Sequence, residues 1–87
     1  MEAARLPDGR VAITFTYDES LVLSDALSRW ETAGAIEALP FADKAEKIVI
    51  LDLIASFEPV IDEAFSDQYG SVVARARAAV RGLEAAE

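Results

Sequence analysis

Hydrophobic positions recur along the chain with two different periods. Residues 10–16 alternate apolar side chains, ending at Phe15, with small or polar ones, and this period of two predicts a half-buried strand. The Pro-Asp-Gly sequence at residues 7–9 is typical of a turn, so residues 2–6 are a candidate partner strand. Two strands alone are marginal in water, and we therefore expect them to pack on helices or to pair with a second copy.

After residue 15 the apolar spacing changes to three and four, which predicts an amphipathic helix. Thr16 and Glu19 have the spacing of a capping box at its start, and Gly34 is a typical residue for its end. Asp25 lies on the predicted polar face, four residues before Arg29. We expect these two to form a surface ion pair worth a few tenths of a kcal/mol.

The most apolar segment follows Asp43, a predicted N-cap, and should form the central helix. Pro59 lacks an amide hydrogen, so the helix must kink or break just before it, with residues 60–65 as a short continuation. The Ile-Val-Ile-Leu run at residues 48–51 also suits a buried strand. Residues 47–53 are therefore open to both interpretations.

A third apolar stripe predicts a last helix from Asp67 to about Arg81, with Ser66 as its cap. The elements together predict an α+β fold, mainly α, with an N-terminal β-hairpin or single strand packed on a three-helix bundle whose middle helix is kinked at Pro59. Residues 1–87 should form one domain, with a short edge strand and turn at 1–9 and a fraying tail at 82–87. The predicted core comprises Phe15, Leu23, Leu27, Trp30, Leu53, Phe57, Ile61, Phe65, Tyr69, Val73 and Val80.

Some apolar side chains exceed what a small three-helix core needs. Leu21, Ile48, Val49 and Leu51, together with Asp52, form a predicted interface with a second copy or with another protein. The alternative is that the N-terminal hairpin covers them. An exposed edge of the hairpin is a further candidate for pairing.

Composition narrows the available chemistry. The 87 residues include no cysteine and no histidine, which excludes disulfides, thiolate nucleophiles and the commonest general base and metal ligand. The serines lack a neighbouring base of the usual kind, and no phosphate-binding glycine loop or dinucleotide fingerprint occurs. We accordingly predict no catalytic residue, no metal ligand and no cofactor.

Charge bears on the partner. Sixteen acidic and eight basic residues give a formal net charge of −8, which repels a phosphate backbone or an anionic membrane and favours a basic partner. The longest apolar run, residues 48–51, is far shorter than the roughly 18 residues of a membrane span. The first ten residues lack the apolar region of a signal peptide, so we expect a cytoplasmic protein.

Two groups of charged residues suggest alternatives. Glu58, Asp62, Glu63 and Asp67 cluster in the sequence and could hold a divalent cation, although the spacing of an EF-hand is missing. Asp52 shares a helix sector with Glu63 and could be a buried acid with a raised pKa. In both cases a solvated helix surface is the simpler interpretation.

The last helix carries three arginines, Arg75, Arg77 and Arg81. Such a basic group suggests the hypothesis that this helix binds nucleic acid. These arginines bracket the apolar stripe, which suits long side chains that cover apolar surface near a helix C-terminus. The net charge also opposes the nucleic-acid interpretation.

The order of three segments resembles small uncharacterised bacterial proteins. The segments are LVLSDALSRWE, EKIVILDLIASFE and EAFSDQYGSVVARARAAV, within roughly residues 16–81. The most recognisable part is the aromatic-anchored entry into the last helix, with Phe65, Asp67, Tyr69 and Arg77. Pro59 departs from the pattern by interrupting the middle helix. The resemblance implies the fold alone.

These observations favour a non-catalytic protein-interaction module, such as an accessory subunit or an immunity-like inhibitor that binds a basic partner. A small acid-dependent enzyme or a divalent-metal-binding protein is the first alternative. A nucleic-acid-binding regulator that acts through the last helix is the second.

Overall fold

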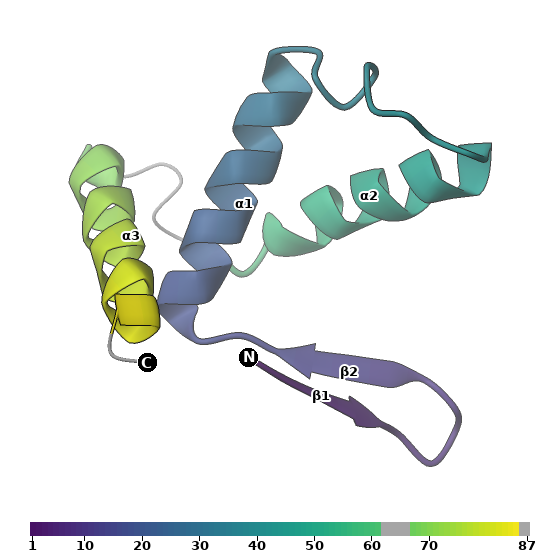
Figure 1. Ribbon diagram of the computed structural model, residues 1–87, viewed down its shortest axis with the longest axis horizontal. Coiled ribbons are helices and arrows are strands. Elements are labelled where there is room, and N and C mark those ends of the chain that lie inside the picture. The colour runs from purple at the N-terminus through teal and green to yellow at the C-terminus, as the bar shows by residue number, and fades with distance from the viewer. Residues whose placement is uncertain (62–66, 86–87) are drawn as a thin grey trace.

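Two strands precede three helices in the computed structural model, which describes residues 1–61 and 67–85, with side chains up to residue 82. The elements are β1 (Glu2–Arg5), β2 (Val11–Thr14), α1 (Tyr17–Thr32), α2 (Lys44–Phe57) and α3 (Tyr69–Ala85). Figure 1 shows α1 at the centre, α3 along one side of it and α2 leaning away on the other, while the hairpin projects from the start of α1. The predicted α+β fold, mainly α, is confirmed.

The N-terminal element is a hairpin rather than a single strand. β1 pairs antiparallel with β2, with Glu2 opposite Thr14 and Arg5 opposite Val11. Gly9 closes the turn at a φ of 90°, a region that suits glycine because it has no Cβ. The amide of Gly9 donates to the carbonyl of Leu6 over 2.9 Å.

The hairpin meets the helices near its end. The ring of Phe15 lies 6.0 Å from that of Phe57 in α2, centroid to centroid. Further out, Val11 and Ile13 keep 62% and 54% of their surface exposed. Within the predicted strand only Ala12 and Phe15 are partly buried, and the apolar positions Val11 and Ile13 are exposed because most of the hairpin extends beyond the helices.

α1 begins and ends where the sequence predicts. The Thr16 hydroxyl accepts a hydrogen bond from the Glu19 amide over 3.1 Å, and the Glu19 carboxylate accepts one from the Thr16 amide over 2.8 Å. This reciprocal capping box satisfies two backbone donors that a helix start leaves unpaired. Ala33 is the C-cap, and Gly34 follows at a φ of 78°.

The ambiguous segment at residues 47–53 is helical, so the strand alternative is wrong. The Asp43 carboxylate caps α2 by accepting a hydrogen bond from the Ala45 amide over 2.7 Å. α2 ends at Phe57, and Pro59 lies in the turn that follows. Pro59 thus ends the helix instead of kinking it, because proline cannot donate the next backbone hydrogen bond. The expected continuation at 60–65 falls mostly outside the described residues.

α3 is displaced along the sequence from its predicted bounds. It begins at Tyr69, two residues after Asp67, and continues past Arg81 to Ala85. Residues 82–85 are consequently helical, although the sequence predicts a fraying tail there. The predicted cap Ser66 lies outside the described residues.

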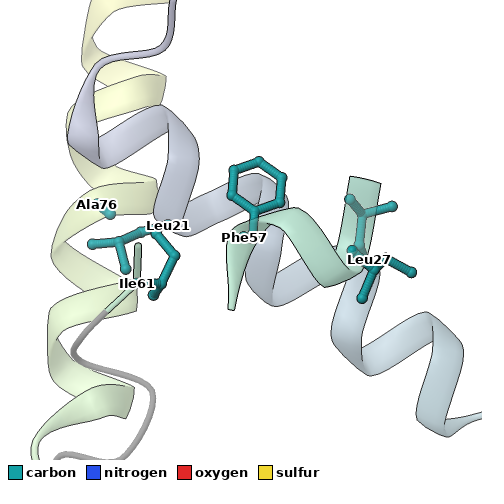
Figure 2. Packing of buried hydrophobic residues seen from close by; sticks show 6 residues of the cluster. Leu21, Leu27, Phe57, Ile61 and Ala76 are labelled. Atoms are coloured by element: carbon teal, nitrogen blue, oxygen red, sulfur yellow. The ribbon is translucent and has the colours of Figure 1, made fainter. Parts of the chain in front are cut away.

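The core forms where α1 meets its two neighbours. Figure 2 shows Leu21 and Ile61 beside Ala76 of α3, and Phe57 of α2 close to α1. The buried cluster comprises Leu21, Leu27, Ile54, Phe57, Ile61 and Ala76. α1 packs against both α3 and α2, and it is the element that holds the helices together.

Several predicted core residues are placed differently. Leu27, Phe57, Ile61 and Val73 are buried, and Phe15, Leu23, Tyr69 and Val80 are partly buried. The prediction is wrong for Trp30 and Leu53, which keep 46% and 38% of their surface exposed and so lie outside the core. The physical reason is that α2 leans away from the C-terminal half of α1. Phe65 lies outside the described residues.

Candidate protein interface

α2 carries apolar side chains on sides that no other described element covers. Ile54 and Phe57 are buried against α1, whereas Ile48 and Val49 keep 58% and 66% of their surface exposed. Asp52 lies beside them on the same side of the helix and is also exposed. We call Ile48, Val49 and Asp52 the outer face of α2.

Two residues of the predicted interface lie elsewhere. Leu21 is 1% exposed and packs inside the core, so it cannot contribute to an exposed surface. The reason is that α1 has neighbours on two sides, which a single apolar stripe does not reveal. Leu51 is partly buried and packs against the core cluster.

An apolar hollow lies between the C-terminal half of α1, the following loop and α2. Its lining residues are Leu27, Trp30, Ala35, Ile36, Leu39 and Ile50. Trp30 and Leu39 stand at its exposed margin, with 46% and 41% of their surface exposed. The hollow continues the uncovered apolar surface from α2 toward the end of α1.

The principal polar site is a cluster around Asp25 that joins α1 to α3. One carboxylate oxygen accepts a hydrogen bond from the Tyr69 hydroxyl over 2.9 Å. The other accepts from Arg29 Nε over 2.9 Å and from Arg77 Nη2 over 2.8 Å. Asp25 itself is 8% exposed, so both oxygens are largely removed from water.

The electrostatics follow from these contacts. Burial raises the pKa of Asp25, but hydrogen bonds from Arg29 and Tyr69 and the charges of Arg29 and Arg77 lower it below its ordinary value. Burial, together with the hydrogen bond to the Asp25 carboxylate, raises the pKa of Tyr69 to about 12. Asp25 therefore stays ionised and Tyr69 stays protonated at neutral pH.

The predicted surface ion pair between Asp25 and Arg29 is therefore only part of a larger, mostly buried cluster. α3 covers the polar face of α1 at this point, so Ser24 and Asp25 are buried. The sequence contains one signal that could have found the cluster. Tyr69 and Arg77 are eight residues apart and lie on one face of α3, suitably placed to reach a common acceptor.

The acidic candidates that the structure describes do not form a metal site. Asp52, Glu58 and Asp67 are exposed, so the hypothesis of a buried Asp52 is wrong. Asp62 and Glu63 lie outside the described residues. Across residues 1–61 and 67–85, no three acidic side chains converge on a point where a metal ion could bind.

The three arginines predicted as a nucleic-acid-binding group have different surroundings. Arg77 is engaged by Asp25 across the α1–α3 interface, while Arg75 and Arg81 are exposed on α3. Only Arg75 and Arg81 of the three therefore lack an ion pair among the described residues, because Arg77 binds Asp25.

The fold and the uncovered face define a small, mainly helical α+β protein with an unusually open packing of α2. No family model, curated protein or solved structure matches this chain. In the part of the chain that the structure describes, no helix has the length and apolar character needed to cross a membrane.

Proposed function

We propose that this chain is a non-catalytic protein-interaction module, an accessory subunit or immunity-like inhibitor, that binds a basic partner protein in the cytoplasm. The observation that supports the proposal is the number of exposed carboxylates that have no ion-pair partner. Eight carboxylates are exposed and make no ion pair among the described residues. Asp43 and Glu46 accept backbone hydrogen bonds at the start of α2, and the remaining six are those of Glu2, Asp18, Glu31, Asp52, Glu58 and Asp67.

Half of the eight basic side chains are already neutralised by ion pairs within the chain. Arg10, Arg29, Lys47 and Arg77 each have an acidic partner within the chain. The formal net charge of −8 makes the surface potential negative. Among the described residues, carboxylates without an ion pair outnumber cations without one. Such a field steers a basic partner toward the surface and raises the association rate, and salt weakens the effect.

The test is affinity capture with the intact protein at low salt, followed by kinetics with each captured protein. We expect the association rate to fall as salt rises. Replacing Asp18, Glu31 and Glu58 by lysine should slow association about tenfold or more. The matched control is Arg75→Glu, an exposed change of charge that should leave association intact or speed it.

Two results would contradict the proposal. One is the absence of any stable partner under these conditions. The other is a complex whose association rate is indifferent to salt and to the three charge reversals. Circular dichroism of each variant verifies that the helices are retained.

A further inference from the structure

α2 is apolar around more of its circumference than α1 can cover. α1 buries Ile54 and Phe57, yet Ile48 and Val49 on the outer face remain 58% and 66% exposed. A helix that is apolar on nearly all sides is normally buried on nearly all sides. The outer face of α2 therefore lacks a packing partner within the described residues.

The whole molecule shows the same deficit. Its radius of gyration is 14.7 Å, where a compact domain of this length has about 12 Å. Its accessible surface is 6585 Å², where a compact monomer of this mass has about 5,000 Å². The surplus exceeds the roughly 800 Å² that each partner contributes to a standard interface. A second copy has room to bind without any loss of the internal core.

The charges beside the outer face are arranged for self-pairing. Lys44, Ile48 and Asp52 are spaced by four residues and lie along one ridge of α2. Lys44 and Asp52 are both exposed and have no ion-pair partner among the described side chains. The ridge thus has an apolar centre with opposite charges at equal distances on its two sides.

We propose that the protein forms a symmetric homodimer in which the two α2 helices pack antiparallel, centred on Ile48. In this register Ile48 meets Ile48 of the second copy, and Lys44 meets Asp52 of the second copy at both ends. A parallel arrangement would place like charges together, which is unfavourable. A twofold axis produces each contact twice, as in most soluble dimers. This dimer does not depend on the proposed basic partner.

The response to salt separates the two proposals. Each copy carries a formal net charge of −8, so two copies repel one another and salt relieves this repulsion. Salt also screens the two Lys44–Asp52 attractions, so the homodimer, which is held mainly by the apolar contacts at Ile48, should persist as salt rises, whereas binding of a basic partner should weaken. Failure of one proposal therefore leaves the other unaffected.

The first test is the mass of the intact protein by sedimentation equilibrium at physiological salt or above. We expect a dimer of the 9.4 kDa chain, and Ile48→Glu should convert it to a monomer with unchanged helicity. The control is Val11→Glu, because Val11 is similarly exposed at 62% but lies on the hairpin. A monomeric wild type at high concentration would overturn the proposal, as would a dimer that Ile48→Glu leaves intact.

The second test examines the register by exchanging charges. Lys44→Asp and Asp52→Lys should each raise the dissociation constant about tenfold, because each replaces two attractions by two repulsions. A mixture of the two variants should form a heterodimer, and the double variant should regain the dimer. If the mixture associates no better than either variant alone, the antiparallel register is wrong.

Discussion

Arg77 of α3 donates a hydrogen bond from Nη2 to the carboxylate of Asp25 in α1 over 2.8 Å, across 52 residues of sequence. Tyr69 donates to the same carboxylate from two turns earlier on α3. Asp25 thereby connects two helices through a hydroxyl and a guanidinium. Since the arginines keep about half of their side-chain surface exposed, the cluster is only partly protected from solvent.

We expect Asp25→Asn to lower the free energy of unfolding by about 2 kcal/mol at pH 7. The figure lies below the 3 to 5 kcal/mol of a fully buried pair, because solvent screens the exposed guanidinium groups. Urea denaturation measures it. The control Glu31→Gln changes an exposed carboxylate of the same helix, α1, and should have little effect.

We expect the contribution of the Asp25 carboxylate to the free energy of unfolding to depend on pH in the acid range. The folded protein lowers the pKa of Asp25, so its contribution is complete above the unfolded pKa of about 4 and is lost as the pH falls through the folded pKa. Urea denaturation from pH 7 to pH 2 should therefore show a shallower decline for Asp25→Asn than for the wild type. Parallel curves would contradict the assignment.

We expect the contribution of Tyr69 to the free energy of unfolding to depend on pH in the alkaline range. Folding raises its pKa to about 12 from an ordinary value near 10, so the folded state favours the protonated hydroxyl. Its contribution is complete below pH 10 and is lost as the pH rises from 10 to about 12. The chain has two tyrosines, so ultraviolet absorbance of a Tyr17→Phe variant reports Tyr69 alone. A midpoint near 10 in the folded protein would contradict this prediction.

Phe57 is expected to be the most sensitive position of α2. Its side chain is 9% exposed and contacts Phe15, so Phe57→Ala should remove about 3 to 5 kcal/mol of stability by leaving a cavity. That is a large part of the roughly 4 to 13 kcal/mol expected for a domain of this size. Val60→Ala is the control, since Val60 is 61% exposed and lies outside the outer face of α2, and chemical denaturation should show a much smaller loss for it.

Trp30 provides a direct check on the open packing of α2. It is the single tryptophan and is 46% exposed at the margin of the hollow between α1 and α2. We expect acrylamide to quench its fluorescence readily in dilute folded protein. Strong protection from quenching at a concentration where the chain is monomeric would mean that the hollow is closed.

Local patterns are sufficient for the turn of the hairpin and for the starts of α1 and α2. Thr16 with Glu19, Gly34, Asp43 and the turn before β2 act within a few residues, so their sequence spacing specifies the backbone geometry around them. Pro59 predicts an interruption of the helix, but whether it bends or ends α2 depends on what the next segment packs against.

The sequence by itself determined a mainly helical chain with an N-terminal hairpin or single strand, an acidic surface and more apolar residues than a small three-helix core needs. Only the tertiary structure decided that Leu21 is buried, that Trp30 is exposed and that Asp25 binds Tyr69 and Arg77. The physical reason is that periodicity identifies the apolar side of one helix, whereas burial depends on how many neighbours that helix has and at what angle they cross it.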